Sequence, residues 1–317
     1  MRVLVTGASG CIGHYICEAL IEQTDHELFL LVRDPAKLKI DVSVRPGVHV
    51  LTVNLRDLEP LAELLPTINQ AVLTATAWGD PVETFDLNVT KTLELIQQLD
   101  PQVCQQVLYF STASILSREE KLLPQAREIG TDYIRSKYQC FEQLQQLKSI
   151  PKVVTVFPTL VFGGDENKPD SHLSGGLPEV MRWANLLRFF KMEGSFHFIH
   201  GRDIAQLICY LVQHPEAAPS ERLVLGNQSM TVNEFIEAVC EVCDKRAFFK
   251  INLSPVLTDL VIRLFNIQMA DWDRFCLDYR HFSYPHAINP ATVGLASYCS
   301  TLRDLLRLNA EPKTIDG

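Results

Sequence analysis

The chain has 317 residues, of which 47% are hydrophobic and 21% are charged. This composition is close to the globular average and excludes a disordered or fibrous protein. The 29 Lys and Arg residues against 38 Asp and Glu residues give a net charge of −9, and no long basic block occurs, which excludes nucleic acid as the main partner.

Cysteine usage and hydropathy bear on the compartment. Nine cysteines are scattered along the chain, and an odd number without a compact spacing is unlike the disulfide framework of a small secreted domain. No stretch approaches ~18 uninterrupted apolar residues. We therefore expect a cytoplasmic protein with no integral membrane segment.

Apolar runs rich in β-branched residues alternate with helical spacing in the first half of the chain. The predicted strands are 2–6, 27–32, 48–53, 70–76, 105–111 and 152–158, and the predicted helices are 11–23, 58–65, 81–99 and 130–147. Strands that alternate with helices predict a parallel sheet covered on both faces. We expect an α/β fold with a doubly wound parallel (Rossmann) sheet, and a dinucleotide-binding domain over residues 1–158.

The second half is richer in loops. Residues 159–317 are predicted to form a smaller substrate-binding domain of discontinuous segments, partly returning to the first domain. Helices are predicted at 177–187, 202–213, 232–243 and 253–268. The last helix has an apolar stripe, for which core or dimer packing is favoured over membrane-surface binding because Arg263 is its only basic residue.

Residues 6–13 read TGxxGxxG directly after a predicted strand and at the start of a predicted helix. Gly7 permits a tight turn, Gly10 lets a pyrophosphate approach the backbone, and Gly13 allows close helix packing. Free amides and the helix dipole favour phosphate there. The predicted cofactor-binding residues of this loop are Gly7, Ser9, Gly10, Cys11, Ile12 and Gly13.

Arg33 stands at the end of the second predicted strand. An acidic residue at that point binds the ribose hydroxyls of NAD, whereas an arginine pairs with the 2′-phosphate of NADP. Lys37 would assist Arg33 in binding this phosphate, whereas the negative charge of Asp34 would disfavour it. We expect NADP as the cofactor, with NAD as the alternative.

Tyr133 and Lys137 lie four residues apart in a predicted helix, which places them on one face. A nearby ammonium favours the phenolate, so this pair suits proton exchange near neutral pH. The preceding strand ends in the hydroxyls of Ser111, Thr112 and Ser114, any of which could orient a substrate oxygen.

Together, TGxxGxxG at the N-terminus, the hydroxyl-rich strand end and YxxxK about twenty residues later resemble the short-chain dehydrogenase/reductase family. The substrate half makes the chain similar to its extended branch, the NAD(P)-dependent epimerases, dehydratases and dihydroflavonol-reductase-like enzymes. The resemblance implies Tyr133 as general acid/base, Lys137 as its pKa partner and ribose ligand, and Thr112 as the substrate-orienting hydroxyl, with Ser111 and Ser114 as alternatives.

Further segments extend the resemblance. It implies cofactor contacts from Asn54, Leu55, Ala75, Thr76, Ala77 and Pro158, in addition to Tyr133 and Lys137. Residues 88–92 are similar to the family's NVxGT helix and residues 198–203 to its HVxD segment. The chain departs from the family at Asn54, Lys91, Leu116, Ser117 and Phe157, and the loss of an arginine at 157 weakens the expectation of a nucleotide-sugar substrate.

Other reactive side chains have simpler explanations. Cys240 and Cys243 form a CxxC without a second pair, so we interpret them as packing residues rather than metal ligands; no metal is expected. His197 and His200 are expected to have structural or surface roles. Arg182, Arg188 and Lys191 could meet an anionic substrate or form a solvated face.

These observations predict an NAD(P)-dependent oxidoreductase that transfers hydride to or from a carbonyl or carbinol carbon of a small molecule, with NADP favoured. The first alternative is a nucleotide-sugar epimerase or dehydratase with tightly bound NAD. The second is a non-catalytic NAD(P)-binding regulatory or assembly protein. Family members often pair through the helix that carries the tyrosine, so a homodimer is a further expectation.

Overall fold

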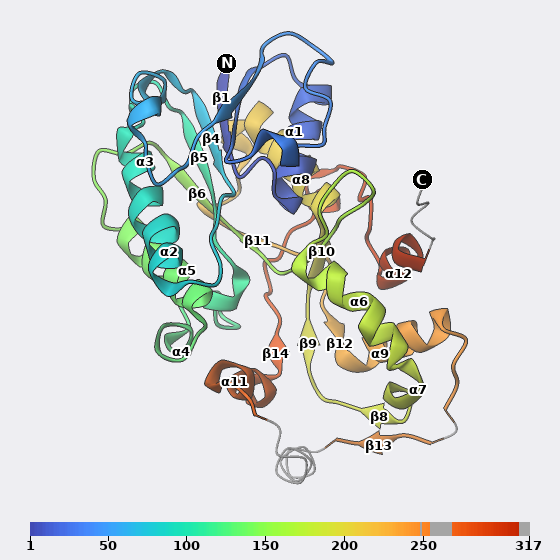
Figure 1. Cartoon of the computed structure of the whole chain (residues 1–317). Helices are drawn as coiled ribbons and strands as arrows, with labels where there is room; N and C mark the ends of the chain where they lie inside the picture. Colours follow the sequence, from blue (N-terminus) through green and yellow to red (C-terminus); the bar gives the residue numbers. More distant parts are fainter. Residues whose placement is uncertain (248, 254–267, 311–317) are drawn as a thin grey trace.

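A computed structural model describes residues 1–247, 249–253 and 268–310. Its centre is a seven-stranded parallel sheet with the order β11-β6-β5-β4-β1-β2-β3 (Figure 1). The strands are β1 (Arg2–Thr6), β2 (Glu27–Val32), β3 (Val48–Thr52), β4 (Gln70–Leu73), β5 (Gln106–Phe110), β6 (Val153–Pro158) and β11 (Arg222–Leu225). The order reverses between β1 and β4, which is where ligands bind in such sheets.

Helices cover both faces of the sheet, so its central strands are buried and apolar. One face packs against α1 (Cys11–Gln23) and α8 (Gly201–Gln213). The other packs against α3 (Thr92–Gln98) and α5 (Asp132–Leu144), with α2 (Pro81–Phe85) alongside (Figure 1). The predicted doubly wound sheet is confirmed.

Two predicted helices of this half are interrupted. Residues 58–65 form short 3₁₀ turns, η2 (Glu59–Leu61) and η3 (Leu65–Thr67), because prolines in both turns remove backbone donors that an α-helix needs. The predicted helix 81–99 is divided by a π-helical segment, η4 (Asp86–Lys91). The strand β11 was not predicted, since three apolar residues after Arg222 carry too little periodicity to identify a strand.

The remaining elements of the first half are short. They are η1 (Pro35–Lys37), η5 (Ala113–Ile115) and α4 (Pro124–Glu128). The predicted helix 130–147 is α5, which begins after its N-cap residue Thr131 and ends at Leu144.

The remaining elements, which we call the second part, are small sheets and helices, several of which surround a further buried cluster. The helices are α6 (His172–Arg182), α7 (Ala184–Leu187), η6 (Pro215–Ala217), α9 (Val232–Val242), α11 (Asp271–Tyr279), η7 (Pro290–Val293) and α12 (Leu302–Ala310), and the strands are β7 (Leu160–Phe162), β8 (Phe190–Lys191), β9 (Ser195–Phe196), β10 (Phe198–His200), β12 (Met230–Thr231), β13 (Ile251–Asn252) and β14 (His281–Phe282). Phe162, Phe198, Val239 and Leu305 belong to the buried cluster. The predicted helix 253–268 lies mostly outside the described residues.

A buried carboxylate connects the second part to α8. Asp203 is fully buried and accepts hydrogen bonds from the backbone amides of Tyr298 (2.6 Å) and Cys299 (3.0 Å). Burial raises the pKa of this carboxyl, while the two amides oppose the rise. The bonds fix the C-terminal segment against the helix that packs on α1. Among the described residues, no helix has the length and hydropathy needed to cross a membrane.

Candidate active site

The glycine-rich turn between β1 and α1 has no room for side chains. Gly7 has φ +69°, and a Cβ on it would lie 2.7 Å from the Ala75 nitrogen. A Cβ on Gly13 would lie 2.0 Å from the Gly7 carbonyl oxygen. Gly10 is the N-cap of α1 and provides no side-chain cap, so the first amides of the helix can serve an anion. This bare cradle fits the pyrophosphate of a dinucleotide.

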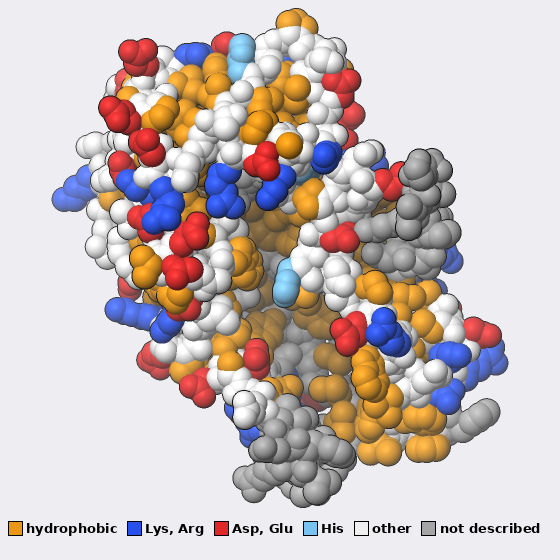
Figure 2. Space-filling view, viewed as in Figure 1, with side chains coloured by type: hydrophobic (Ala, Val, Ile, Leu, Met, Phe, Trp, Pro, Cys, Tyr) orange, Lys and Arg blue, Asp and Glu red, His pale blue; other side chains and the backbone are white. Residues whose placement is uncertain are grey.

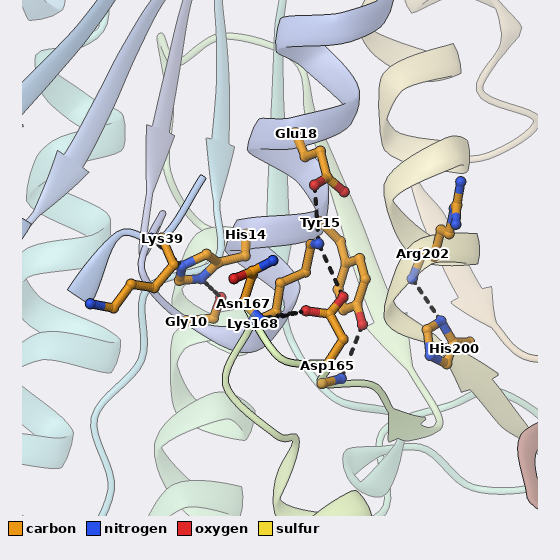
Figure 3. Close-up of polar contacts among 11 residues, drawn as sticks. Gly10, His14, Tyr15, Glu18, Lys39, Asp165, Asn167, Lys168, His200 and Arg202 are labelled. Atoms are coloured by element: carbon orange, nitrogen blue, oxygen red, sulfur yellow. Dashed lines mark hydrogen bonds and ion pairs between the residues drawn. The ribbon is translucent and has the colours of Figure 1, made fainter. Parts of the chain in front are cut away.

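A buried histidine on α1 holds this turn in place through hydrogen bonds. His14 is fully buried on α1, and its Nδ1 lies 2.8 Å from the Gly10 carbonyl oxygen. Its Nε2 accepts a hydrogen bond of 3.2 Å from the Lys39 amide (Figure 3). The sequence analysis did not identify His14. Its ring ties the glycine turn to the segment that follows β2, and so connects two parts of the cofactor cleft.

The loop after β7 contacts α1 through Tyr15 and Glu18 (Figure 3). The Gly164 amide donates to the Tyr15 hydroxyl at 3.0 Å. Lys168, whose side chain is 9% exposed, lies 3.0 Å from a Glu18 oxygen and 3.1 Å from an Asp165 oxygen. These bonds fasten the first loop of the second part to the helix that starts the cofactor site.

His200 completes this contact. Its ring packs edge-on against Tyr15, and its Nδ1 accepts from the Arg202 amide at 3.1 Å. Burial lowers the pKa of His200 to about 4, with the Arg202 charge acting in the same direction. The imidazole is therefore neutral at physiological pH, and its contacts hold α8 against α1. His197 is also buried, with Nδ1 2.7 Å from the Asn227 oxygen and Nε2 accepting from the Tyr284 amide at 2.9 Å.

The predicted adenine end of the cleft is exposed. Arg33 projects from the end of β2 with 73% of its side chain exposed, and its closest ionic partner is Glu83 at 3.7 Å. Asn54, after β3, accepts from the Arg56 amide within a turn. Leu55 and Ala75 line one small cavity together with Thr6. The residues predicted to contact the cofactor after β2, β3 and β4 therefore lie along the same edge of the sheet.

A buried asparagine organises the loop after β4. Asn88 Oδ1 accepts from the Thr76 hydroxyl (3.0 Å) and the Ala77 amide (2.8 Å). Its Nδ2 donates to the Ala77 carbonyl and, at 3.0 Å, to the Ser136 hydroxyl on α5. Asn88 lies in the π-helical turn of η4. A side chain with two donors and two acceptors thus ties the cofactor-side loop to the helix that carries Tyr133.

The three predicted catalytic side chains meet at the end of β5. Lys137 is 2% exposed, and its Nζ donates to the Phe110 carbonyl at 2.8 Å and lies 5.9 Å from the centre of the Tyr133 ring. Burial lowers the pKa of Lys137 to about 8. Burial raises the pKa of the Tyr133 phenol, and a hydrogen bond with Thr112 opposes this rise. The geometry brings a hydroxyl, a phenol and an ammonium together.

The two alternative hydroxyls have different environments. Ser114 accepts from the Thr112 hydroxyl at 3.3 Å and donates its own amide to the Thr112 oxygen. Ser111 is buried, and its Oγ has no hydrogen-bond partner among the described residues. Of these three hydroxyls, that of Thr112 acts on the Tyr133 phenol, whose pKa it lowers against the larger effect of burial.

An unpredicted aromatic side chain covers this cluster. Trp78 follows Ala77 and stacks on Tyr133 with the ring centres 3.7 Å apart and the planes at 11°. It is 60% exposed, and His172 of α6 stacks beyond it at 6.4 Å. The position of Trp78 directly after the strand-end residues could have indicated a role near the site. Nothing in the sequence, however, showed that its ring would contact Tyr133 on α5.

Phe157, Cys240 and Cys243 pack against neighbouring elements in this arrangement. Phe157 is fully buried and packs edge-on against Phe141 at 5.2 Å, with Pro158 beside it at the end of β6. The Cys240 and Cys243 sulfurs lie near the carbonyls of Ala184 and Met181. No group of metal-ligating side chains occurs among the described residues.

Comparisons with known proteins place the chain. Residues 3–226 match the model of the NAD dependent epimerase/dehydratase family. A UDP-glucose 4-epimerase of Klebsiella pneumoniae is 27% identical over 135 residues, which are 38% of this chain and 96% of that protein.

Solved structures show the same fold. The UDP-glucose 4-epimerase of Thermotoga maritima with UDP-glucose superposes with a TM-score of 0.64 at 15% identity, covering 98% of this chain and 97% of that one. A mutant UDP-glucuronic acid 4-epimerase of Bacillus cereus, in a complex that contains NAD, gives 0.60 at 15% identity, with 80% and 86% covered. The chain belongs to the NAD dependent epimerase/dehydratase family.

Proposed function

We propose that this protein is an NAD-dependent epimerase or dehydratase that acts on a carbinol carbon of a nucleotide-linked sugar. The observation that carries the proposal is the cluster of Thr112, Tyr133 and Lys137 at the end of β5. Family membership and relatives named for UDP-sugars support this substrate class over a simple carbonyl. The nucleotide-sugar epimerase or dehydratase, which the sequence suggested as the first alternative, is therefore better supported than the reductase.

The dinucleotide would be held by the glycine turn, by Asn54, Leu55, Ala75, Thr76, Ala77 and Pro158, and by Lys137 at the ribose. When bound, its nicotinamide supplies a reversible hydride acceptor. Tyr133 would take the proton from the substrate hydroxyl and return it later, while Thr112 orients that oxygen. The Lys137 ammonium would stabilise the phenolate that forms. We further propose that residues 159–317 bind the rest of the substrate.

An NADP-dependent reductase is the second candidate, and one observation favours it. The Arg33 guanidinium is exposed at the end of β2 and is only loosely paired with Glu83. An arginine there can receive a 2′-phosphate. A non-catalytic NAD(P)-binding role is the third candidate, and the intact cluster at Tyr133 argues against it.

Cofactor analysis separates these functions. We expect NAD to be released when the purified protein is denatured, and UDP-hexoses to be interconverted or dehydrated without net oxidation of added NADPH. The Tyr133→Phe variant should keep the nucleotide and lose turnover. Net NADPH oxidation with a carbonyl panel, lost in Arg33→Ala but kept in Arg127→Ala, would instead establish the reductase. Absence of any turnover, with biological activity retained in Tyr133→Phe, would establish the non-catalytic role.

Two coarser proposals accompany this function. All nine cysteines are free thiols, which fits a reducing compartment such as the cytoplasm. A homodimer through the helix of Tyr133 remains a proposal that light scattering would test.

A further inference from the structure

Large apolar side chains lie exposed along one edge of the second part. Trp183 is 54% exposed, Leu186 49%, Phe249 61% and Ile251 43%. Trp183 and Leu186 lie on one turn, since the Leu186 amide donates to the Trp183 carbonyl at 2.8 Å. Scattered single apolar residues on a surface need no explanation, whereas a contiguous group marks a contact site.

Backbone pairing joins these residues into one surface. β8 and β13 pair in parallel, with Ile251 opposite Phe190. Phe189 and Phe249 stack with their ring centres 5.1 Å apart. The Arg188 guanidinium donates to the Arg246 carbonyl at 3.0 Å. Residues 180–192 therefore form a single edge with residues 245–247 and 249–253, which lie far from them in the sequence, and we call this surface the apolar edge.

The charge of this edge is opposite to that of the molecule. Its two segments contain six basic residues and no Asp or Glu, in a chain with a net charge of −9. The basic residues are Arg182, Arg188, Lys191, Lys245, Arg246 and Lys250. Figure 2 shows hydrophobic side chains over α7, β8 and β13 with Lys and Arg beside them at the lower right.

Two acidic residues of the neighbouring helix α9 form ion pairs, one with the edge itself and one away from it. Glu237 pairs with Lys250, and Glu241 pairs with Arg303 at 2.8 Å. Asp244 lies beyond the end of α9. Lys250 is neutralised by Glu237, and Asp244 lines the same hollow as Lys245 and Arg246. Five basic side chains of the edge thus stand against this one carboxylate, which leaves the edge with a net positive charge.

We propose that the apolar edge docks on an anionic lipid bilayer. Exposed Trp, Phe, Leu and Ile side chains between Lys and Arg residues have the composition of a peripheral membrane contact. Aromatic rings favour the headgroup region, while basic side chains bind acidic headgroups. A second protein copy would bring the same positive charges together, which disfavours self-association through this edge. The active site does not contribute to the contact.

Vesicle flotation of the full chain tests the proposal. We expect binding to vesicles of phosphatidylglycerol and phosphatidylcholine, weak binding to phosphatidylcholine alone, and release at high salt because ions screen the attraction. Trp183→Ala with Phe249→Ala should abolish binding. Arg182→Gln, Lys191→Gln and Arg246→Gln together should weaken it about a hundredfold, since each basic residue contributes roughly a factor of five at an anionic surface.

Matched variants remove the same groups elsewhere. Val44→Ala with Val82→Ala removes two exposed apolar side chains (61% and 74% exposed), and Lys121→Gln, Lys148→Gln and Lys152→Gln together remove three exposed charges. Both should bind vesicles as the unaltered chain does. Equal binding to neutral vesicles, or unchanged binding by the Trp183 and Phe249 variant, would overturn the proposal. So would failure to bind any vesicle together with a dimer that this variant dissociates. Dinucleotide binding by each variant reports on folding and on the active site separately.

Discussion

The sheet half and the second part hold their functional residues by different means. Around the sheet, backbone strands bring Thr112, Lys137 and the glycine turn together, and buried side chains such as Asn88 lock the loops between them. The second part is joined to this frame by a few discrete bonds, notably those of Asp203 and Lys168. The proposed catalytic residues therefore lie on a frame of paired strands, whereas the proposed substrate-binding part is held to that frame by individual side-chain bonds.

The largest expected effect is at the scaffold's proton-transfer group. Tyr133→Phe should lower kcat about a thousandfold, within the range that general acid/base groups contribute, and should leave dinucleotide affinity within a fewfold. Steady-state kinetics with a UDP-hexose and nucleotide titration check this. A variant that keeps full kcat would remove Tyr133 from the mechanism.

Substitutions of two glycines in the same turn should distinguish a loss of stability from a loss of dinucleotide binding. Gly13→Ala places a Cβ 2.0 Å from the Gly7 carbonyl oxygen and should destabilise the fold by about 3 kcal/mol. Gly10→Ala meets the same oxygen at 3.3 Å and should cost far less stability while weakening dinucleotide binding. Thermal unfolding with and without NAD gives both quantities. Equal destabilisation by the two variants would contradict this division.

A substitution of Asp203 tests whether individual bonds hold the second part to the sheet half. Asp203→Asn leaves only one side-chain oxygen for the two amides of Tyr298 and Cys299 and introduces a donor, so we expect a loss of about 2 kcal/mol. Hydrogen exchange should rise in the C-terminal segment and stay low in β1, β4 and β5. Exchange that rises equally throughout would show that the second part is not separately anchored.

The buried Lys137 should make the free energy of unfolding depend on pH. Its pKa in the folded chain is about 8 because burial disfavours the ammonium, below its ordinary value of about 10.4 in unfolded chains. The unfolded chain then binds more protons between these values, so stability rises with pH from about 8 to about 10, by up to about 1.4 kcal/mol per pH unit. Denaturant unfolding of the unaltered chain against Lys137→Met checks this, since the variant lacks the rise.

The smallest effect is expected at Trp78. Its ring lies on Tyr133 yet remains 60% exposed, so Trp78→Phe should change kcat/KM by no more than about twofold and Trp78→Ala by roughly fivefold. The loss of about 1 kcal/mol of aromatic stacking sets this scale. A larger change in KM than in kcat would indicate contact with substrate, and an unchanged KM would assign the ring to Tyr133 alone.

Much of the scaffold could be predicted from local sequence. The glycine turn, the six predicted strands and the Tyr133–Lys137 pair depend on residues close in the chain, where steric needs and helical spacing leave a readable pattern. The breaks at η2, η3 and η4 were missed although prolines mark the first two, because a periodic apolar pattern outweighed them in the prediction.

The sequence by itself determined the fold class, the dinucleotide turn and the chemical types available at the end of β5, because each is encoded within a few neighbouring residues. Only the tertiary structure decided that β11 joins the sheet, that Trp78 covers Tyr133, and that residues 180–192 form one edge with residues 249–253. These contacts join residues separated by tens of positions, and such pairing depends on packing, which leaves no periodic trace in the sequence.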